Sequence, residues 1–122
     1  MMGRRLVQAV VLAASIALGA TQALAHAIVL KAKPAPGAIV AGPDLTLSLR
    51  YNGRIDHARS RLTLIGPDGA TKRIAIAPDS PADSLTAALQ GLSPGAYRLR
   101  WQVLSVDGHI TRGEVPFQIS AP

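Results

Sequence analysis

Three histidines, His26, His57 and His109, are the side chains of this sequence best suited to bind a metal ion. His109 follows Asp107 and Gly108, so an imidazole and a carboxylate stand two residues apart. Residues i and i+2 of an extended chain share a face, and Gly108 permits a bulge or a close approach of the backbone. Asp107 and His109 could therefore meet a single ion. The alternative is a simple turn, because Asp-Gly is a common turn pair.

His26 gains a second ligand atom only if it becomes the first residue of a processed chain. Residues 1–25 begin with Arg4-Arg5, continue with an apolar run to about residue 20, and end with Ala23-Leu24-Ala25. This order predicts a secretory signal peptide that is cleaved after Ala25. A retained membrane anchor is the other interpretation, but the apolar run is short against the about 20 residues of a span. The pattern favours the general secretory route.

A free N-terminal histidine offers its α-amine and its Nδ1, which close a six-membered ring with a metal. The amine must first lose a proton, against a typical pKa of about 7.7–8.0, and Cu(II) competes best among first-row divalent ions. Asp107 and His109 would add a carboxylate oxygen and an imidazole nitrogen. Such a nitrogen and oxygen set suits tetragonal Cu(II), whereas zinc prefers a tetrahedron. We therefore expect one Cu(II) ion per chain, held by His26, Asp107 and His109, unless His26 merely marks where the leader is cut.

The composition excludes two kinds of sulfur ligand. The chain has no cysteine, which excludes disulfides and thiolate ligands. Met1 and Met2 are its only methionines, so a processed chain has no thioether and we expect no Cu(I) methionine site. The sequence has 13 basic and 7 acidic residues, and loss of the leader would leave a net charge of about +4. No lysine or arginine block indicates nucleic-acid binding, and we expect a soluble monomer.

The remaining 97 residues, 26–122, predict a single all-β domain. Proline and glycine divide the chain into short stretches rich in valine, isoleucine, leucine and threonine, as in a sandwich or barrel. We expect an Ig-like or cupredoxin-like Greek-key β-sandwich of about seven strands in two antiparallel sheets, with the longest strand starting at Gly95. Period-two alternation marks the clearest strands, with these inward residues: Leu45, Leu47, Leu49, Tyr51; Leu62, Leu64; Tyr97, Leu99, Trp101, Val103; Val115, Phe117, Ile119.

Residues 78–84 and the segment around His57 lie outside these strands. Residues 78–84 read as a polar loop. His57 stands beside Asp56 and Arg59 and is interpreted as a solvated loop histidine, with a fourth-ligand or supporting role as the alternative. Arg50, Arg98 and Arg100 fall on outward positions and are given no chemistry.

The sequence resembles the CopC family of periplasmic copper-binding proteins. The resemblance is carried by His26, by Lys33-Pro34-Ala35-Pro36-Gly37, by residues 45–52, and above all by residues 97–117, which include Asp107-Gly108-His109. It implies a Greek-key sandwich or barrel, a high-affinity Cu(II) site at His26, Asp107 and His109, and exchange of copper with an inner-membrane transporter. Some members also hold Cu(I) in a methionine-rich loop, which this sequence lacks.

These observations predict a periplasmic Cu(II) carrier or buffer in copper resistance, homeostasis or transport, and not an enzyme. An N-terminal histidine with a second histidine is also the arrangement of copper-dependent polysaccharide monooxygenases. In this chain Asp107 would fill a position that oxygen needs, and 97 residues leave little room for a substrate platform. A metal-free structural sandwich is the third interpretation, since fold alone does not specify function.

Overall fold

The computed structural model describes residues 27–122, which form eight strands and one short 3-10 helix. The expected leader and His26 lie outside the described residues. Within residues 27–122 no helix is long and apolar enough to cross a membrane. The elements are β1 (Val29–Lys33), β2 (Ala38–Ala41), β3 (Leu45–Tyr51), η1 (His57–Arg59), β4 (Arg61–Ile65), β5 (Thr71–Ile74), β6 (Ser84–Leu89), β7 (Gly95–Leu104) and β8 (Ile110–Ser120).

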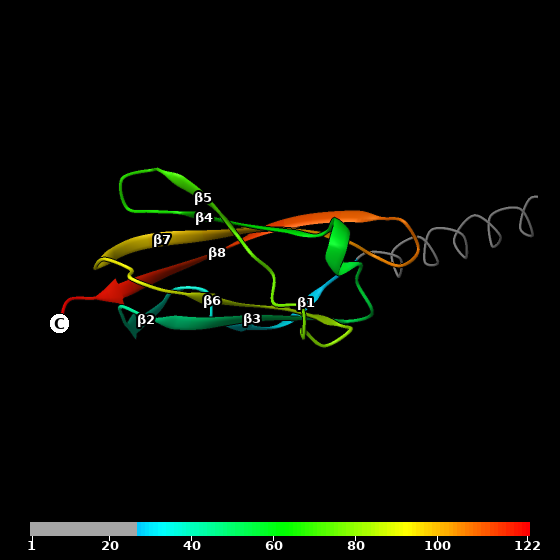
Figure 1. Cartoon of the computed structure of the whole chain (residues 1–122), viewed down its shortest axis with the longest axis horizontal. Coiled ribbons are helices and arrows are strands. Elements are labelled where there is room, and N and C mark those ends of the chain that lie inside the picture. The colour runs from blue at the N-terminus through cyan, green and yellow to red at the C-terminus, as the bar shows by residue number, and fades with distance from the viewer. Residues whose placement is uncertain (1–26) are drawn as a thin grey trace, which may run out of the picture.

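The strands form two sheets that pack face to face (Figure 1). The three-stranded sheet has the order β1-β3-β6, and the five-stranded sheet has the order β2-β8-β7-β4-β5. Neighbours in each sheet are mostly not consecutive in the chain, which agrees with the expected Greek-key sandwich. The β7–β8 loop, η1 and the start of β1 lie at one end of the sandwich, and the C-terminus lies at the other (Figure 1). We call the first of these the loop end.

The alternating positions build the core between the sheets, as the sequence predicted. Leu47, Leu49 and Tyr51 of β3 are buried from one side, and Leu99 and Trp101 of β7 are buried from the other. The rings of Tyr51 and Trp101 pack in a T-shaped pair, with centroids 5.4 Å apart and an interplanar angle of 73°, a favourable geometry for aromatic pairs. The expectation that Trp101 belongs to the core is therefore confirmed.

Several sequence-based boundaries differ from the structure. Eight strands are present where about seven were expected, and β8, with 11 residues, is longer than β7, with 10. Ser84 begins β6 and does not end a loop. The serine, threonine and alanines of β6 hide its alternation, and the proline and glycine around β2 conceal that four-residue strand.

One pairing departs from the expected antiparallel sheets. β2 pairs with β8 in parallel, with Ala38 opposite Phe117 and Ala41 opposite Ser120. The turn before β2 carries the chain from β1 across to the other sheet, where Gly37 N donates to Pro116 O at 2.7 Å. Because this turn crosses between sheets and forms no hairpin, β2 joins the five-stranded sheet as a parallel edge strand.

Candidate metal centre

The candidate ligands Asp107 and His109 lie in the loop that joins β7 to β8. Ten cross-strand pairs, ending with Leu104 opposite Ile110, hold the two strands together up to this loop. Ser105 N donates to His109 O at 2.8 Å, and Gly108 N donates to Ser105 O at 2.9 Å, so the loop is closed by its own backbone. Gly108 has a φ of +91°, a conformation that side-chain-bearing residues rarely adopt. The segment is therefore a tight turn, and the extended conformation predicted for Asp107 to His109 is wrong.

The turn nevertheless brings the two side chains together. His109 Nδ1 lies 3.2 Å from Asp107 Oδ1, and the backbone N–H of His109 donates to the same oxygen at 3.3 Å. The hydrogen bond from the His109 side chain is the main reason why the pKa of Asp107 lies below its ordinary value. An ionised Asp107 accepts from Nδ1–H, and the lone pair of the neutral imidazole then lies on Nε2. In this arrangement Nε2 is the atom of His109 that is open to a metal, and direct ligation by Asp107 would require its carboxylate to turn from Nδ1 toward the ion.

The segment that follows β3 holds this turn in place. Ile55 forms an isolated β-bridge with Ser105, and Asp56 N donates to Leu104 O at 2.8 Å. Ile55 is itself buried in the core. These contacts attach the base of the turn to the segment after β3. The loop that carries Asp107 and His109 is therefore held in place from its base.

The same segment anchors the start of the described chain. Ile28 N donates to Asn52 Oδ1 at 3.0 Å, and Asn52 N donates to Ile28 O at 3.0 Å. Ala27 is buried, and Val29 pairs with Tyr51. Asn52 was not among the candidate residues predicted from the sequence. The only signal for it is its position directly after a strong strand, which does not reveal a partner 24 residues away.

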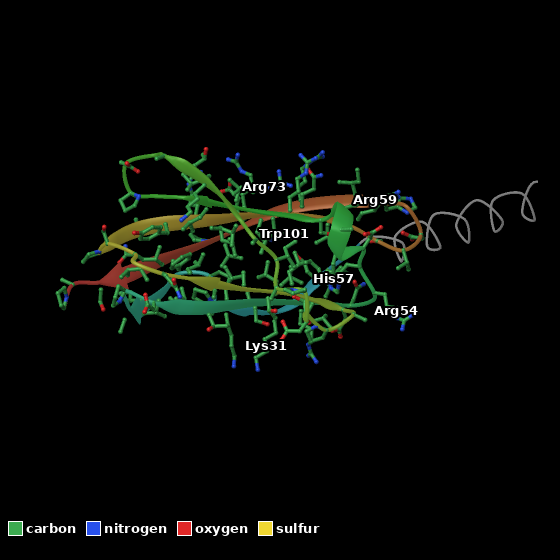
Figure 2. The ribbon with its side chains drawn as sticks, viewed as in Figure 1. Lys31, Arg54, His57, Arg59, Arg73 and Trp101 are labelled. Atoms are coloured by element: carbon green, nitrogen blue, oxygen red, sulfur yellow. The ribbon has the colours of Figure 1, made fainter. Side chains whose placement is uncertain are left out.

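His57 has a structural role that the sequence analysis did not predict. It lies in η1, where its Nε2 contacts Pro81 O at 3.0 Å and Ser84 O at 2.8 Å. His57 is half-buried in this short turn between β3 and β4, and its ring contacts backbone carbonyls in addition to solvent. A ring nitrogen that donates to carbonyls does not offer a lone pair to a metal, so the contacts also weigh against the fourth-ligand alternative through Nε2. His57 links η1 to the start of β6 (Figure 2).

The structure brings together two of the three predicted ligands. No group of three or more histidine, aspartate or glutamate side chains placed to hold a metal occurs within residues 27–122. The predicted third ligand, His26, lies outside the described residues, directly before the anchored Ala27. The three-ligand site therefore stays a prediction, whereas the pairing of Asp107 with His109 is observed.

Exposed apolar side chains border the turn. Val106 is 72% exposed and Ile110 is 51% exposed, and they lie on either side of the Asp107-Gly108-His109 segment. Ile28, at the anchored chain start, is 55% exposed. The loop end thus combines two polar candidate ligands with an apolar surface that no described part of the chain covers.

Comparisons with known proteins identify relatives of this fold. Protein YobA of Escherichia coli (strain K12) is 28% identical over 98 residues, which cover 78% of this chain and 79% of YobA. The crystal structure of CopC from Methylosinus trichosporium OB3b matches with a TM-score of 0.70 and 26% identity, covering 78% of this chain and 94% of that one. PcoC from Escherichia coli, described as a methionine-rich copper resistance protein, matches with a TM-score of 0.64 and 24% identity, covering 79% and 100%. At that identity, the likeness to PcoC shows the fold alone.

The family assignment rests on the length of the match. The CopC domain matches residues 29–120, which include all eight strands and the Asp107-Gly108-His109 turn. The expected resemblance and the β-sandwich fold are both confirmed, and the chain belongs to the CopC family.

Proposed function

We propose that this protein binds one Cu(II) ion through the processed N-terminal His26 together with Asp107 and His109. The observation that carries the proposal is the contact of 3.2 Å between Asp107 and His109, at the same end of the sandwich where the chain start is anchored. Consecutive Cα atoms lie about 3.8 Å apart, so His26 is tethered one peptide unit from the buried Ala27. This tether supports a position for His26 near the loop end.

The donor set supports Cu(II) over other ions. An amine, two imidazoles and a carboxylate suit the tetragonal geometry of Cu(II), and the order of divalent affinities favours copper over zinc. The relative PcoC is described as methionine-rich, whereas this chain has methionine only at positions 1 and 2. A single Cu(II) site without a methionine Cu(I) site is therefore the proposed cargo chemistry.

We further propose that the protein is a periplasmic copper carrier or buffer that serves copper resistance, homeostasis or transport. The basic and apolar leader over residues 1–25 supports export with cleavage after Ala25. The exposed Val106 and Ile110 beside the candidate ligands support transient docking of a protein that exchanges copper, such as a transporter in the inner membrane. The processed domain is proposed to be soluble and monomeric.

Binding fits the site better than catalysis. Copper oxygenases need an open metal position for oxygen, and Asp107, which contacts His109 at 3.2 Å, would fill one if its carboxylate turned to the ion. The enzyme and metal-free alternatives gain no specific support from residues 27–122.

A copper titration followed by electron paramagnetic resonance tests the proposal. The exported protein is purified, His26 is verified as its first residue by mass spectrometry, and Cu(II) is added. We expect one tetragonal, nitrogen-rich signal that saturates at one ion per chain. His109→Ala, and an added residue before His26, should each weaken binding by orders of magnitude. His57→Ala is the matched control, because it removes a histidine that contacts backbone carbonyls.

Three outcomes would count against the proposal. Equal affinity of the extended and the processed chain would show that the terminal amine is not a ligand. Equal loss in His57→Ala and His109→Ala would show that the turn has no special role. Sustained oxygen consumption with a reductant and a polysaccharide would favour the enzyme alternative.

A further inference from the structure

The outward side of the five-stranded sheet carries every arginine of its strands. Sheet register places these residues in cross-strand rows on one surface, which we call the arginine face. Its rows are Arg61–Gln102–Arg112, then Arg73–Thr63–Arg100–Glu114, then Ile65–Arg98–Pro116. The inward neighbours Leu62, Leu64, Leu99 and Trp101 belong to the core, so the alternation turns every arginine outward.

The arginine face has very little compensating charge. Glu114 is its only acidic residue, and it contacts Arg100 at 3.2 Å and Arg98 at 3.4 Å. These three side chains stay well exposed, so the contacts neutralise little. Within residues 27–122, Arg61, Arg73 and Arg112 form no ion pair. Arg112 only donates to Gln102 Oε1 at 2.8 Å.

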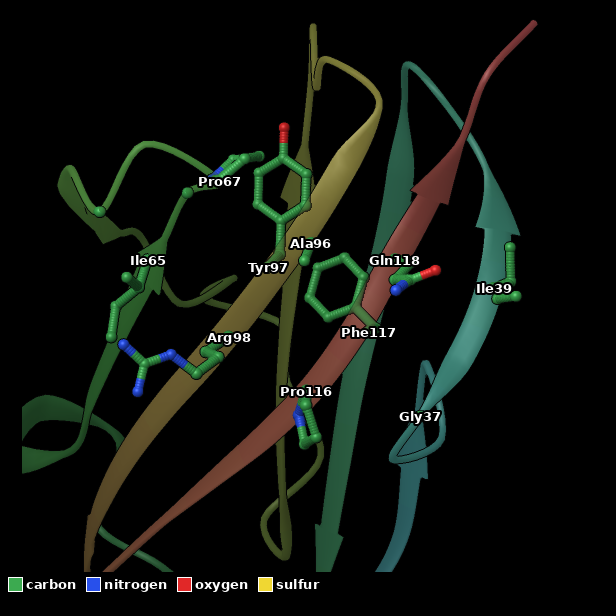
Figure 3. Close-up of a pocket in the computed structure, with 12 residues that line it drawn as sticks. Gly37, Ile39, Ile65, Pro67, Ala96, Tyr97, Arg98, Pro116, Phe117 and Gln118 are labelled. Atoms are coloured by element: carbon green, nitrogen blue, oxygen red, sulfur yellow. The ribbon is translucent and has the colours of Figure 1, made fainter.

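The arginine face continues into an apolar groove toward the end of the sheet opposite the loop end (Figure 3). Ile39, Pro67, Ala96 and Pro116 line it, and Arg98 lies at its border. Ile39 is 68% exposed, which is unusual for so large an apolar side chain. One surface of the molecule therefore carries several guanidinium groups beside exposed apolar residues. We call Ile39 and the groove next to it the apolar strip.

We propose that the arginine face docks on the surface of an anionic phospholipid bilayer. Arginine recognises phosphate through paired N–H donors, and here the guanidinium groups are spread over a flat sheet and do not converge on one point. Such an array matches a plane of lipid phosphates better than a single small anion. The bilayer interface also offers an apolar boundary beside the phosphates, which suits Ile39 and the groove.

Docking of this kind leaves the candidate copper ligands accessible. Asp107 and His109 lie in the turn beyond the last β7–β8 pair, outside the rows of the arginine face. The proposal is independent of copper, and its test needs no metal. It would place a carrier on the membrane with its loop end still open to a partner.

The opposite side of the sandwich provides a matched control. Lys31, Lys33 and Arg50 lie on the outward side of the three-stranded sheet, beside Ser48 and Ser84. Figure 2 shows Lys31 and Arg73 projecting from opposite sides of the molecule. Removing three charges from either side changes the net charge equally. A difference between the two variants therefore reports orientation and not overall charge.

The experiment is co-sedimentation of the exported protein with vesicles of phosphatidylglycerol or of phosphatidylcholine. We expect binding to the anionic vesicles only, with release at about 0.5 M salt, where screening acts within a few ångströms. Each basic residue near an anionic surface strengthens binding about five-fold. Arg61→Gln/Arg73→Gln/Arg112→Gln should therefore weaken binding about 100-fold, whereas Lys31→Gln/Lys33→Gln/Arg50→Gln should weaken it less than about ten-fold.

The apolar strip is tested separately by Ile39→Ser. This variant should weaken vesicle binding several-fold without changing its salt dependence, because it removes apolar contact and no charge. Thermal unfolding confirms that each variant is folded.

Three results would overturn the proposal. The first is equal loss in the two triple variants, which would mean attraction by net charge alone. The second is equal affinity for both kinds of vesicle. The third is retention on a polyglutamate resin by protein that does not sediment with anionic vesicles, which would point to an acidic protein as the partner. Failure here leaves the copper proposal intact, since that concerns the loop end.

Discussion

Replacing Asn52 with alanine tests whether the fold positions the chain start for metal binding. The change removes the Oδ1 that accepts from Ile28 N at 3.0 Å, while the backbone bond from Asn52 N to Ile28 O remains possible. No residue other than glycine has a positive φ within residues 27–122, so alanine can adopt the backbone conformation of Asn52 without strain. The substitution therefore acts on the anchor at Ile28.

The expected magnitude follows from the type of this hydrogen bond. It is a bond between neutral groups at an exposed position, and such bonds contribute about 0.5–1.5 kcal/mol. If the anchor holds His26 near Asp107 and His109, its loss must be compensated on binding. Since about 1.4 kcal/mol is a factor of ten in affinity, we expect Cu(II) affinity to fall about two- to ten-fold. The free energy of unfolding should fall by a similar amount.

The assay is competition for Cu(II) with a chelator of known affinity, combined with urea unfolding of the metal-free protein. Gln90→Ala is the control, because Gln90 is exposed and follows β6, next to Gly91, which is tied to Asp44 away from the loop end. Unchanged affinity in Asn52→Ala, despite a measurable loss of stability, would refute the anchoring argument. A loss as large as that of His109→Ala would also refute it, because Asn52 would then act as a ligand.

Three further predictions concern the site and the core around it. Cu(II) affinity should fall from pH 8 to about pH 5, because amines and imidazoles must be deprotonated to bind. The lowered pKa of Asp107 keeps this carboxylate ionised across that range, and a flat chelator-competition profile would contradict the nitrogen ligands. His57→Ala should lower the free energy of unfolding by about 1–2 kcal/mol in a urea melt, because two carbonyls lose their donor, while copper affinity is unchanged. Gly113→Ala should lower the free energy of unfolding by about 1–3 kcal/mol, because a Cβ there would overlap the indole of Trp101; a melting temperature equal to that of the wild type would contradict this packing.

The sequence predicted the sandwich well because its alternation reports burial directly. β3 and β7 place an apolar residue at every second position. In the structure these residues face the core, and the residues between them face outward. β6 was missed as a strand because serine, threonine and alanine fill positions that a larger apolar residue would mark. The parallel pairing of β2 depends on a turn that changes sheets, and no local pattern encodes that choice.

The candidate site was predictable in part. Asp107 and His109 were identified from residue type and spacing, and the structure pairs them, although through a turn with Gly108 at φ +91°. The supports were not predictable. Asn52 reaches Ile28, and His57 reaches Ser84, across 24 and 27 residues of chain. Contacts over such separations depend on which strands pair, so they appear only once the tertiary structure is known.

The position of the candidate ligands also indicates whether folding depends on bound copper. Asp107 and His109 are exposed on a turn, and none of the buried core residues is a predicted ligand. Small zinc domains differ, because their metal replaces a core and they unfold without it. Here the core of two packed sheets forms without any metal ligand, so the metal-free protein should remain folded. Bound copper would then stabilise it only by mass action, in proportion to the logarithm of its concentration over the dissociation constant. Binding would therefore depend on the release of His26 by the peptidase, whereas folding of the sandwich would not.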